Sequence, residues 1–267
     1  PYIHKEIFQA FGSCTLLQKL HLHLALTSKV PGSMLTVLFY HMAFLVKIRS
    51  LVITIDSIDM PSDQEGHIEC LEAALKQMKT LEKIKLGGAI GLSNASFANF
   101  QKSPSFLPNL TKLSFDFSSD LFAEQLIILV SCKKLLRGIK SFSLRVRKAV
   151  SLKNEHLLSF FAILSQLANL HELTLDFQLS VVTKMCLQAL EGVLLSLTNL
   201  RSLKLNLLCE ELVFVDLMGL VKAIMLMKEL VTVTLFLPKE VPDLVLIGNE
   251  LITHRKLHYI VDNLVQN

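Results

Sequence analysis

One pattern, apolar-x-x-apolar-x-apolar-x-apolar, recurs eight times along the 267 residues of the chain, at intervals of about 30 residues. The copies run from Leu17 to Leu24, Ile48 to Ile55, Leu81 to Gly88, Leu110 to Phe117, Ile139 to Val146, Leu170 to Phe177, Leu200 to Leu207 and Leu230 to Leu237. A fixed period of this kind is the signature of a repeat architecture, in which each unit buries its apolar face against its neighbours. The chain is therefore expected to fold as an array of similar units.

Each unit reads as a strand followed by a helix. In the copy at residues 170–177, Leu173, Leu175 and Phe177 alternate with polar residues, which is the pattern of a half-buried strand. Between strands, as at residues 65–81 and 156–170, apolar residues recur at steps of three and four, which favours a helix. Strands joined by helical crossovers are parallel, and the crossovers are almost always right-handed, so all helices lie on one face of the sheet. We predict a curved α/β horseshoe with the sheet on its concave face and the helices on its convex face.

The L-x-x-L-x-L core at residues 110–115, 170–175 and 200–205 resembles that of leucine-rich repeat proteins, specifically the long-repeat class typified by ribonuclease inhibitor. The resemblance covers roughly residues 3 to 261 and implies a leucine-rich repeat solenoid of about eight to nine repeats. The family usually places Asn or Cys shortly after the third apolar residue, where the side chain bonds the turning backbone. Here those places hold Ala25, Asp56, Ala89, Ser118, Arg147, Gln178, Leu208 and Pro238. The turn after each strand is therefore expected to be built in another way.

The whole chain, residues 1–267, is interpreted as a single domain, because a repeat array grows along one axis and does not need to split at this length. Residues 1–16 are assigned to a partial repeat or helix and residues 17–253 to eight repeats. Residues 254–267 are assigned to a C-terminal cap or an atypical repeat with a ninth strand. Because the chain opens at Pro1 without a methionine, a missing N-terminal region is expected.

Composition argues against two classes of function. Apolar residues make up 51% of the chain, yet no apolar run approaches the length of about 18 residues that a membrane-spanning helix needs. The net charge is only +4 and the basic residues form no continuous run, so nucleic-acid binding is not expected. The five cysteines contain no C-x-x-C pair and indicate buried structural thiols in a reducing, intracellular compartment. The cytoplasm is the expected location, and the basic balance is compatible with mitochondria.

Side chains between the apolar strand positions project from the predicted concave face, where equivalent residues of neighbouring strands form columns about 4.8 Å apart. One column places Arg145 between Asp116 and Asp176, as a self-neutralising ladder or as a grip for a charged partner. The other candidates for partner binding on this face are basic or histidine side chains: Lys19, His21, His23, Lys83, Lys85, Lys112 and Lys204. The four lysines of the N-terminal half either steer an acidic protein segment toward this face or form a merely solvated surface.

No cofactor, metal site or catalytic centre is predicted. His21 and His23 share one face of a strand, but no third ligand has a recognisable spacing nearby. The sequence contains no G-x-S-x-G, no G-x-x-x-x-G-K-[ST] and no G-x-G-x-x-G motif opening a helix. We therefore expect that the protein is not an enzyme.

Two predicted helices, at residues 34–46 and 213–227, are apolar nearly all round. A helix without a polar face needs cover, which comes either from the sheet and the flanking helices or from a partner protein on the convex side. In the second case five adaptable side chains are candidates for the contacts: Met34, Phe39, Met42, Met218 and Met225.

These patterns favour a non-catalytic protein–protein interaction module, a structural or scaffolding subunit of a larger intracellular complex with one or more protein partners. A homo-oligomer is not indicated. F-box proteins often carry this class of repeat, so a substrate-recognition arm of an F-box-type ubiquitin ligase is an alternative. No F-box-like segment precedes residue 16, so this alternative needs the missing N-terminal region. A repeat-type GTPase-activating protein is a third hypothesis, and it would need Arg145 or Asn206 exposed toward a nucleotide site.

Overall fold

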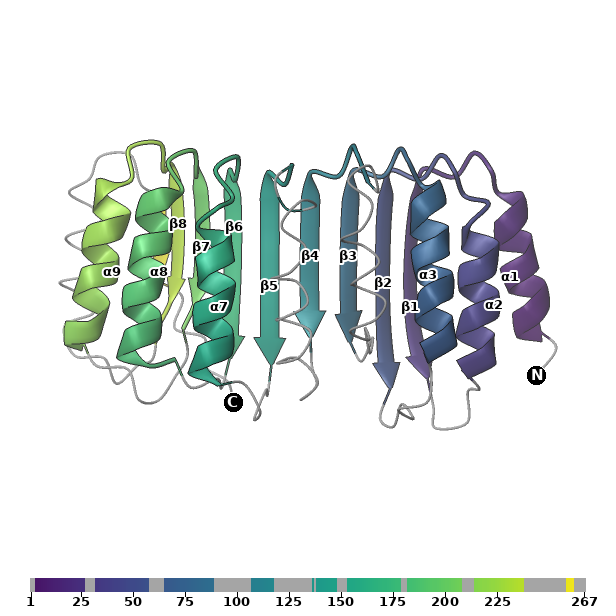
Figure 1. Ribbon diagram of the computed structural model, residues 1–267, viewed down its shortest axis with the longest axis horizontal. Helices are drawn as coiled ribbons and strands as arrows, with labels where there is room; N and C mark the ends of the chain where they lie inside the picture. The colour runs from purple at the N-terminus through teal and green to yellow at the C-terminus, as the bar shows by residue number, and fades with distance from the viewer. Residues whose placement is uncertain are drawn as a thin grey trace. The chain divides into compact units, whose positions relative to one another are not determined.

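Strands and helices alternate along the chain in the computed structural model, as the repeat pattern predicts (Figure 1). The structure describes residues 3–26, 32–57, 65–88, 107–117, 136, 138–147, 153–178, 182–207, 214–237 and 258–261. The chain divides into two compact units: unit 1 comprises Pro1–Phe115 and Ser131–Gly138, and unit 2 comprises Asp116–Val130 and Ile139–Asn267. The single domain and the horseshoe shape expected from the sequence stay predictions.

Unit 1 consists, in its described part, of helices that alternate with strands and of two successive strands at its end. They are α1 (Ile3–Ser13), β1 (Lys19–Leu26), α2 (Gly32–Met42), β2 (Ser50–Ser57), α3 (Glu65–Gln77), β3 (Lys83–Gly88) and the first residues of β4 (Lys112–Phe117). Strand β1 pairs with β2, and β2 with β3, so that Lys19, Ser50 and Lys83 lie level across three strands. Helices α1, α2 and α3 lie side by side in this order (Figure 1). Helix α1 lies ahead of the first repeat segment.

Unit 2 repeats the same order of elements. They are β5 (Ser141–Arg147), α7 (Asn154–Leu164), β6 (Glu172–Gln178), α8 (Lys184–Ser196), β7 (Ser202–Asn206), α9 (Phe214–Leu226), β8 (Thr232–Phe236) and β9 (His258–Val261). Each strand from β5 to β9 pairs in parallel with the next. The stretch assigned to a cap or an atypical repeat therefore contributes a ninth strand.

The core lies between the strands and the helices, because the apolar strand positions all point toward the helices. Along β6, Leu173, Leu175 and Phe177 are at most 1% exposed. Phe177 meets Phe161 of α7 edge-on, with 6.3 Å between the ring centroids, and edge-to-face rings attract beyond the area that they bury. The helices thus cover one face of the sheet, and the alternate strand residues occupy the other, which we call the open face.

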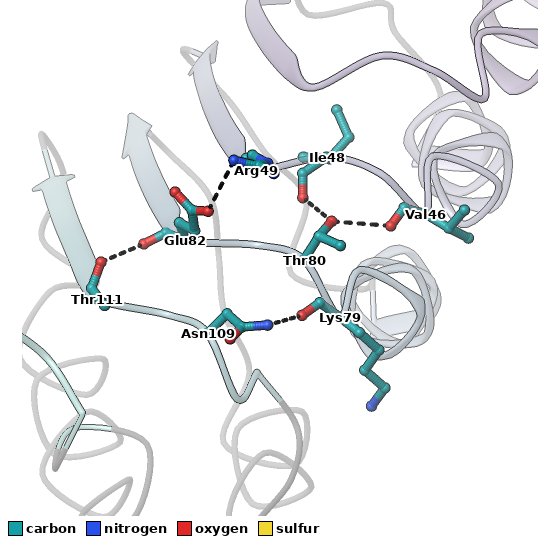
Figure 2. Close-up of polar contacts among 8 residues, drawn as sticks. All are labelled: Val46, Ile48, Arg49, Lys79, Thr80, Glu82, Asn109 and Thr111. Atoms are coloured by element: carbon teal, nitrogen blue, oxygen red, sulfur yellow. Dashed lines mark hydrogen bonds and ion pairs between the residues drawn. The ribbon is translucent and has the colours of Figure 1, made fainter.

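Several turns that lead into a strand are held by side chains that reach back one repeat (Figure 2). Asn109 Nδ2 donates to the carbonyl oxygen of Lys79 at 2.8 Å, and Thr80 Oγ1 donates to that of Ile48 at 2.8 Å. In unit 2, Asn199 Nδ2 makes the equivalent bond to the carbonyl oxygen of Ala168 at 2.8 Å. All three donors precede the first apolar residue of a repeat segment. The polar turn residue therefore stands before the strand, whereas the leucine-rich repeat pattern usually has Asn or Cys after the third apolar residue.

Gly88 ends β3 at the one positive φ recorded for the described glycines, +80°. A Cβ at this position would collide with the backbone carbonyl group of Ile55 on β2, whose register partner is Gly88. Both observations require glycine, because it alone adopts this backbone conformation without steric cost.

The described helices are short, with at most 13 residues. None of them within these ranges has the length and apolar character needed to cross a bilayer.

Candidate functional site

The open face of unit 1 carries a cluster of basic side chains. We call it the basic face and define it by six residues: Lys19, His21, His23, Lys83, Lys85 and Lys112. Five of the six are exposed, and Lys85 is half-buried. Strand register places His21 level with Lys85 across Val52 of β2.

Lys112 joins the same row at the start of β4. Its backbone N–H donates to the carbonyl oxygen of Glu82, just as the N–H of Lys83 donates to that of Arg49 one repeat earlier. Repeated pairing of this kind sets Lys112 beside Lys83 at the spacing of neighbouring strands, about 4.8 Å. Two lysines therefore lie close together on this face.

An exposed ion pair joins the residues just before β2 and β3. Glu82, at the start of β3, is exposed and forms an ion pair with Arg49 at 3.6 Å. The strands hold the four lysines of the basic face on one side of unit 1, and the positive field expected from them stays a prediction.

The two histidines of the basic face have no third metal ligand beside them among the described residues. His21 and His23 both lie on the exposed side of β1, but no group of three His, Cys, Asp or Glu side chains suited to a metal ion occurs among the residues that the structure describes. The absence of a bound metal or cofactor in the living protein stays a prediction.

The open face of unit 2 carries a column in which one arginine lies between two aspartates. Arg145 Nε donates to Asp176 Oδ2 at 2.8 Å, and Arg145 Nη1 lies 3.4 Å from Asp116 Oδ2. The side chain of Arg145 is 34% exposed, whereas that of Asp176 is 8% exposed. The guanidinium group is held between two carboxylates, so its positive charge is compensated on the face itself.

Two polar residues near this column are buried, although they lie on the face of the sheet that no helix covers. Asp176 and Asn206 are each only 5% exposed, and the Oδ1 atom of each is buried without a hydrogen-bond partner. They are register partners on β6 and β7. Lys204, on the same face of β7, is exposed, and its Nζ lies 5.1 Å from the ring centroid of Phe236 in a cation–π contact. The alternation of the sequence predicts that Asp176 and Asn206 lie on the open face, but it does not predict that they are buried.

Two of the five side chains predicted to contact a partner on the helix side are buried, so this part of the prediction is wrong. Phe39 is 1% exposed and Met42 is 0% exposed, so both belong to the core and neither can contact a partner. They lie on the inward stripe of α2, which also contacts α1 and α3. Met34, Met218 and Met225 are half-buried. Their role in partner binding stays a prediction.

Other apolar side chains are exposed on α2 and in the turn that follows. We call Tyr40, Phe44 and Val46 the apolar patch; they are 59%, 46% and 46% exposed, respectively. The rings of Tyr40 and Phe44 meet edge-on, with 5.7 Å between their centroids. Sequence analysis missed them because every position of this helix looked apolar, and only the packing of α2 decides which stripe faces outward.

The described cysteines are all free thiols. Cys14 is exposed, which corrects the expectation of buried structural thiols, whereas Cys186 is buried as expected. Burial, with a smaller contribution from the charge of Glu69, raises the pKa of the half-buried Cys70 thiol. Cys132 and Cys209 lie outside the described residues.

No protein-family model and no curated protein sequence matches the chain. Among 33 solved chains that match by structure is the C-terminal domain of tropomodulin from Caenorhabditis elegans. It is 11% identical in sequence, the match covers 74% of this chain and 91% of that chain, and the TM-score is 0.37. A superposition this loose carries no argument, so the assignment of the fold rests on strand order and register. These fit an α/β repeat fold of the leucine-rich repeat type.

Proposed function

We propose that the protein is a non-catalytic protein–protein interaction module, a structural or scaffolding subunit of a larger intracellular complex. The observation that carries the proposal is the open face of unit 1. Parallel sheets are usually covered on both faces, yet β1 exposes Lys19, His21 and His23 on the face away from the helices. Repeat proteins bind partners on such extended sheet surfaces.

The apolar patch supports the scaffolding form of this proposal. Tyr40, Phe44 and Val46 offer an apolar surface with two aromatic rings on the helix side of unit 1. Aromatic side chains are enriched in protein interfaces, where they bury much area at little cost in side-chain entropy. A subunit held permanently in a complex would cover this patch.

An intracellular location and the ribonuclease-inhibitor-like class remain parts of the proposal. Cys14 is an exposed free thiol, which suits a reducing compartment. A helix of 11 to 13 residues after each of several strands suits the long-repeat class.

Neither alternative gains support from a specific observation. A GTPase-activating role would require an arginine or asparagine free to reach a nucleotide. Arg145 is engaged by two carboxylates, and Asn206 is 5% exposed. The F-box alternative depends on a segment ahead of the repeats, and it makes no demand on the residues described here.

The test is affinity purification of the tagged chain from its native cells, followed by cross-linking mass spectrometry before and after a high-salt wash. We expect a fixed set of proteins that survives the wash and cross-links to both the basic face and the neighbourhood of the apolar patch. Loss of every partner in high salt would contradict the scaffolding role. Recovery of no cross-linked protein would contradict the interaction module itself.

A further inference from the structure

We propose that a row of basic side chains at the start of β5, β6 and β7 binds a phosphoryl group carried by a partner protein. We call it the basic row and define it by three residues: Lys140, His171 and Arg201. The inference goes beyond the proposed function and rests on it only for the premise that the chain binds a protein. It adds a second contact, on unit 2, and the chemical group that this contact recognises.

Backbone hydrogen bonds place the three residues side by side. The N–H of His171 donates to the carbonyl oxygen of Lys140 at 2.8 Å, and the N–H of Arg201 donates to that of His171 at 2.8 Å. Each residue directly precedes a strand, so neighbours in the row lie about 4.8 Å apart, the spacing of paired strands. Lys140 and Arg201 are exposed, and His171 is half-buried. The basic row therefore holds two long cationic side chains on either side of an imidazole.

The same positions in unit 1 show what this geometry can hold. Arg49 and Glu82 stand one residue before β2 and β3, and the N–H of Glu82 donates to the carbonyl oxygen of Arg49 as in the basic row. Their side chains form an ion pair, with 3.6 Å between Arg49 Nη1 and Glu82 Oε1. Side chains at these positions therefore reach far enough to hold an anionic group beside a cation.

The basic row has no internal anion of this kind. Neither Lys140 nor Arg201 forms an ion pair in the described part of the chain. Glu172, the next residue after His171, occupies a position on the open face of β6. The Nδ1 atom of His171 is buried and has no hydrogen-bond partner, so Nε2 is the ring nitrogen left for a group outside the chain. An anion held by this row therefore comes from another molecule.

A phosphoryl group matches the basic row in charge and in the number of its acceptors. A phosphorylated Ser, Thr or Tyr carries a charge of about −1.5 to −2 at pH 7 and three strong acceptor oxygens. Lys140 and Arg201 supply two positive charges, and all three side chains can donate a hydrogen bond. The guanidinium fork of Arg201 can bind two phosphate oxygens at once. A carboxylate offers less charge and one oxygen fewer, so it fits the row less well.

A modified protein segment fits the basic row better than a nucleic acid. Surfaces that bind nucleic acids combine several phosphate contacts along a track with aromatic side chains on which bases stack. The turns at residues 165–171 and 196–201, which carry His171 and Arg201, contain no Phe, Tyr or Trp and no further lysine or arginine. The row therefore suits a single phosphoryl group rather than a chain of phosphates.

The experiment uses the full chain and a short labelled peptide with one central phosphoserine, with binding followed by fluorescence anisotropy. The double variant Lys140→Gln/Arg201→Gln removes both exposed charges of the basic row. The matched control, Lys47→Gln/Lys222→Gln, makes the same change of net charge at two exposed lysines, one in the turn before β2 and one on α9. Circular dichroism checks the folding of both variants, and Arg201→Gln alone replaces the first if that variant does not fold.

We expect the phosphopeptide to bind the wild-type chain, and we expect the basic-row variant to weaken this binding about tenfold or more. The control variant should bind like the wild type, and inorganic phosphate should compete with the peptide. Four results would overturn the inference: no binding to the wild type, equal binding of a peptide with glutamate in place of phosphoserine, equal weakening by both variants, or tighter binding of a single-stranded oligonucleotide through the same residues. If native partners still cross-link to the open face of unit 1 in any of these cases, the proposed function stands and only this second contact is wrong.

Discussion

Replacing Arg145 by Met should destabilise unit 2 far more than loss of an ordinary surface ion pair would. The substitution removes the 2.8 Å bond from Arg145 Nε to Asp176 Oδ2 and leaves a carboxylate that is only 8% exposed. A hydrogen bond to a charged group contributes about 1.5–3 kcal/mol, and breaking a fully buried pair costs about 3–5 kcal/mol. Because Arg145 is 34% exposed, water reaches the site in part, and we expect a loss of about 2–3 kcal/mol in the free energy of unfolding.

Arg49→Met provides the matched control. Arg49 and Glu82 also form an ion pair, at 3.6 Å, but their side chains are 60% and 52% exposed. Exposed pairs contribute about 0–1 kcal/mol, so the control should lose little. Urea unfolding followed by circular dichroism measures both variants, and hydrogen exchange at β5 and β6 locates the loss in unit 2. Equal and small losses would refute the reasoning, since the column would then be an ordinary solvated pair.

Three further results are expected. Gly88→Ala should lower the unfolding free energy by about 2 kcal/mol or more because of its positive φ, whereas Gly192→Ala, with open space around it in α8, should raise it by about 0.5–1 kcal/mol. Phe39→Ala should cost about 3–5 kcal/mol and Tyr40→Ala less than about 1 kcal/mol in thermal or urea unfolding; similar costs would mean that α2 packs with another face inward. Cys14 should react with a thiol reagent in the folded protein while the buried cysteine of α8 stays unlabelled, as peptide mass spectrometry can check; equal labelling would contradict the burial described.

The strands and their register follow from the sequence because both depend on a local, repeated pattern. Alternation along residues 173–177 predicts which side chains face the core, and the constant repeat predicts which residues lie level. The predicted neighbours Arg145 and Asp176 are register partners on β5 and β6, so this prediction is confirmed. A shift of one residue would turn every apolar side chain toward the open face, so the pattern leaves little freedom in the register.

Other features depend on packing between repeats and have no local signal. Within α2, Phe39 and Tyr40 are adjacent large aromatic residues, yet one is 1% and the other 59% exposed. Only the positions of α1, α3 and the sheet separate them. The burial of Asp176 and Asn206 is likewise a property of their neighbours. The turn donors, such as Asn109, are polar residues that recur before the first leucine of a segment. They were not predicted, because the leucine-rich repeat pattern has its polar residue after the strand.

The central claim is that the open face of unit 1 is the partner-binding surface, and site-specific photo-cross-linking tests it most directly. A photoreactive amino acid replaces Val52, in the middle of the open face of β2, in one variant and Tyr40, on the helix side, in another. Our account predicts that, in native cells, the probe at position 52 captures a protein partner and that the capture is lost with Lys19→Glu/Lys83→Glu in the same chain. Capture at position 40 alone would contradict it, because the partner would then bind the helices and leave the open face free.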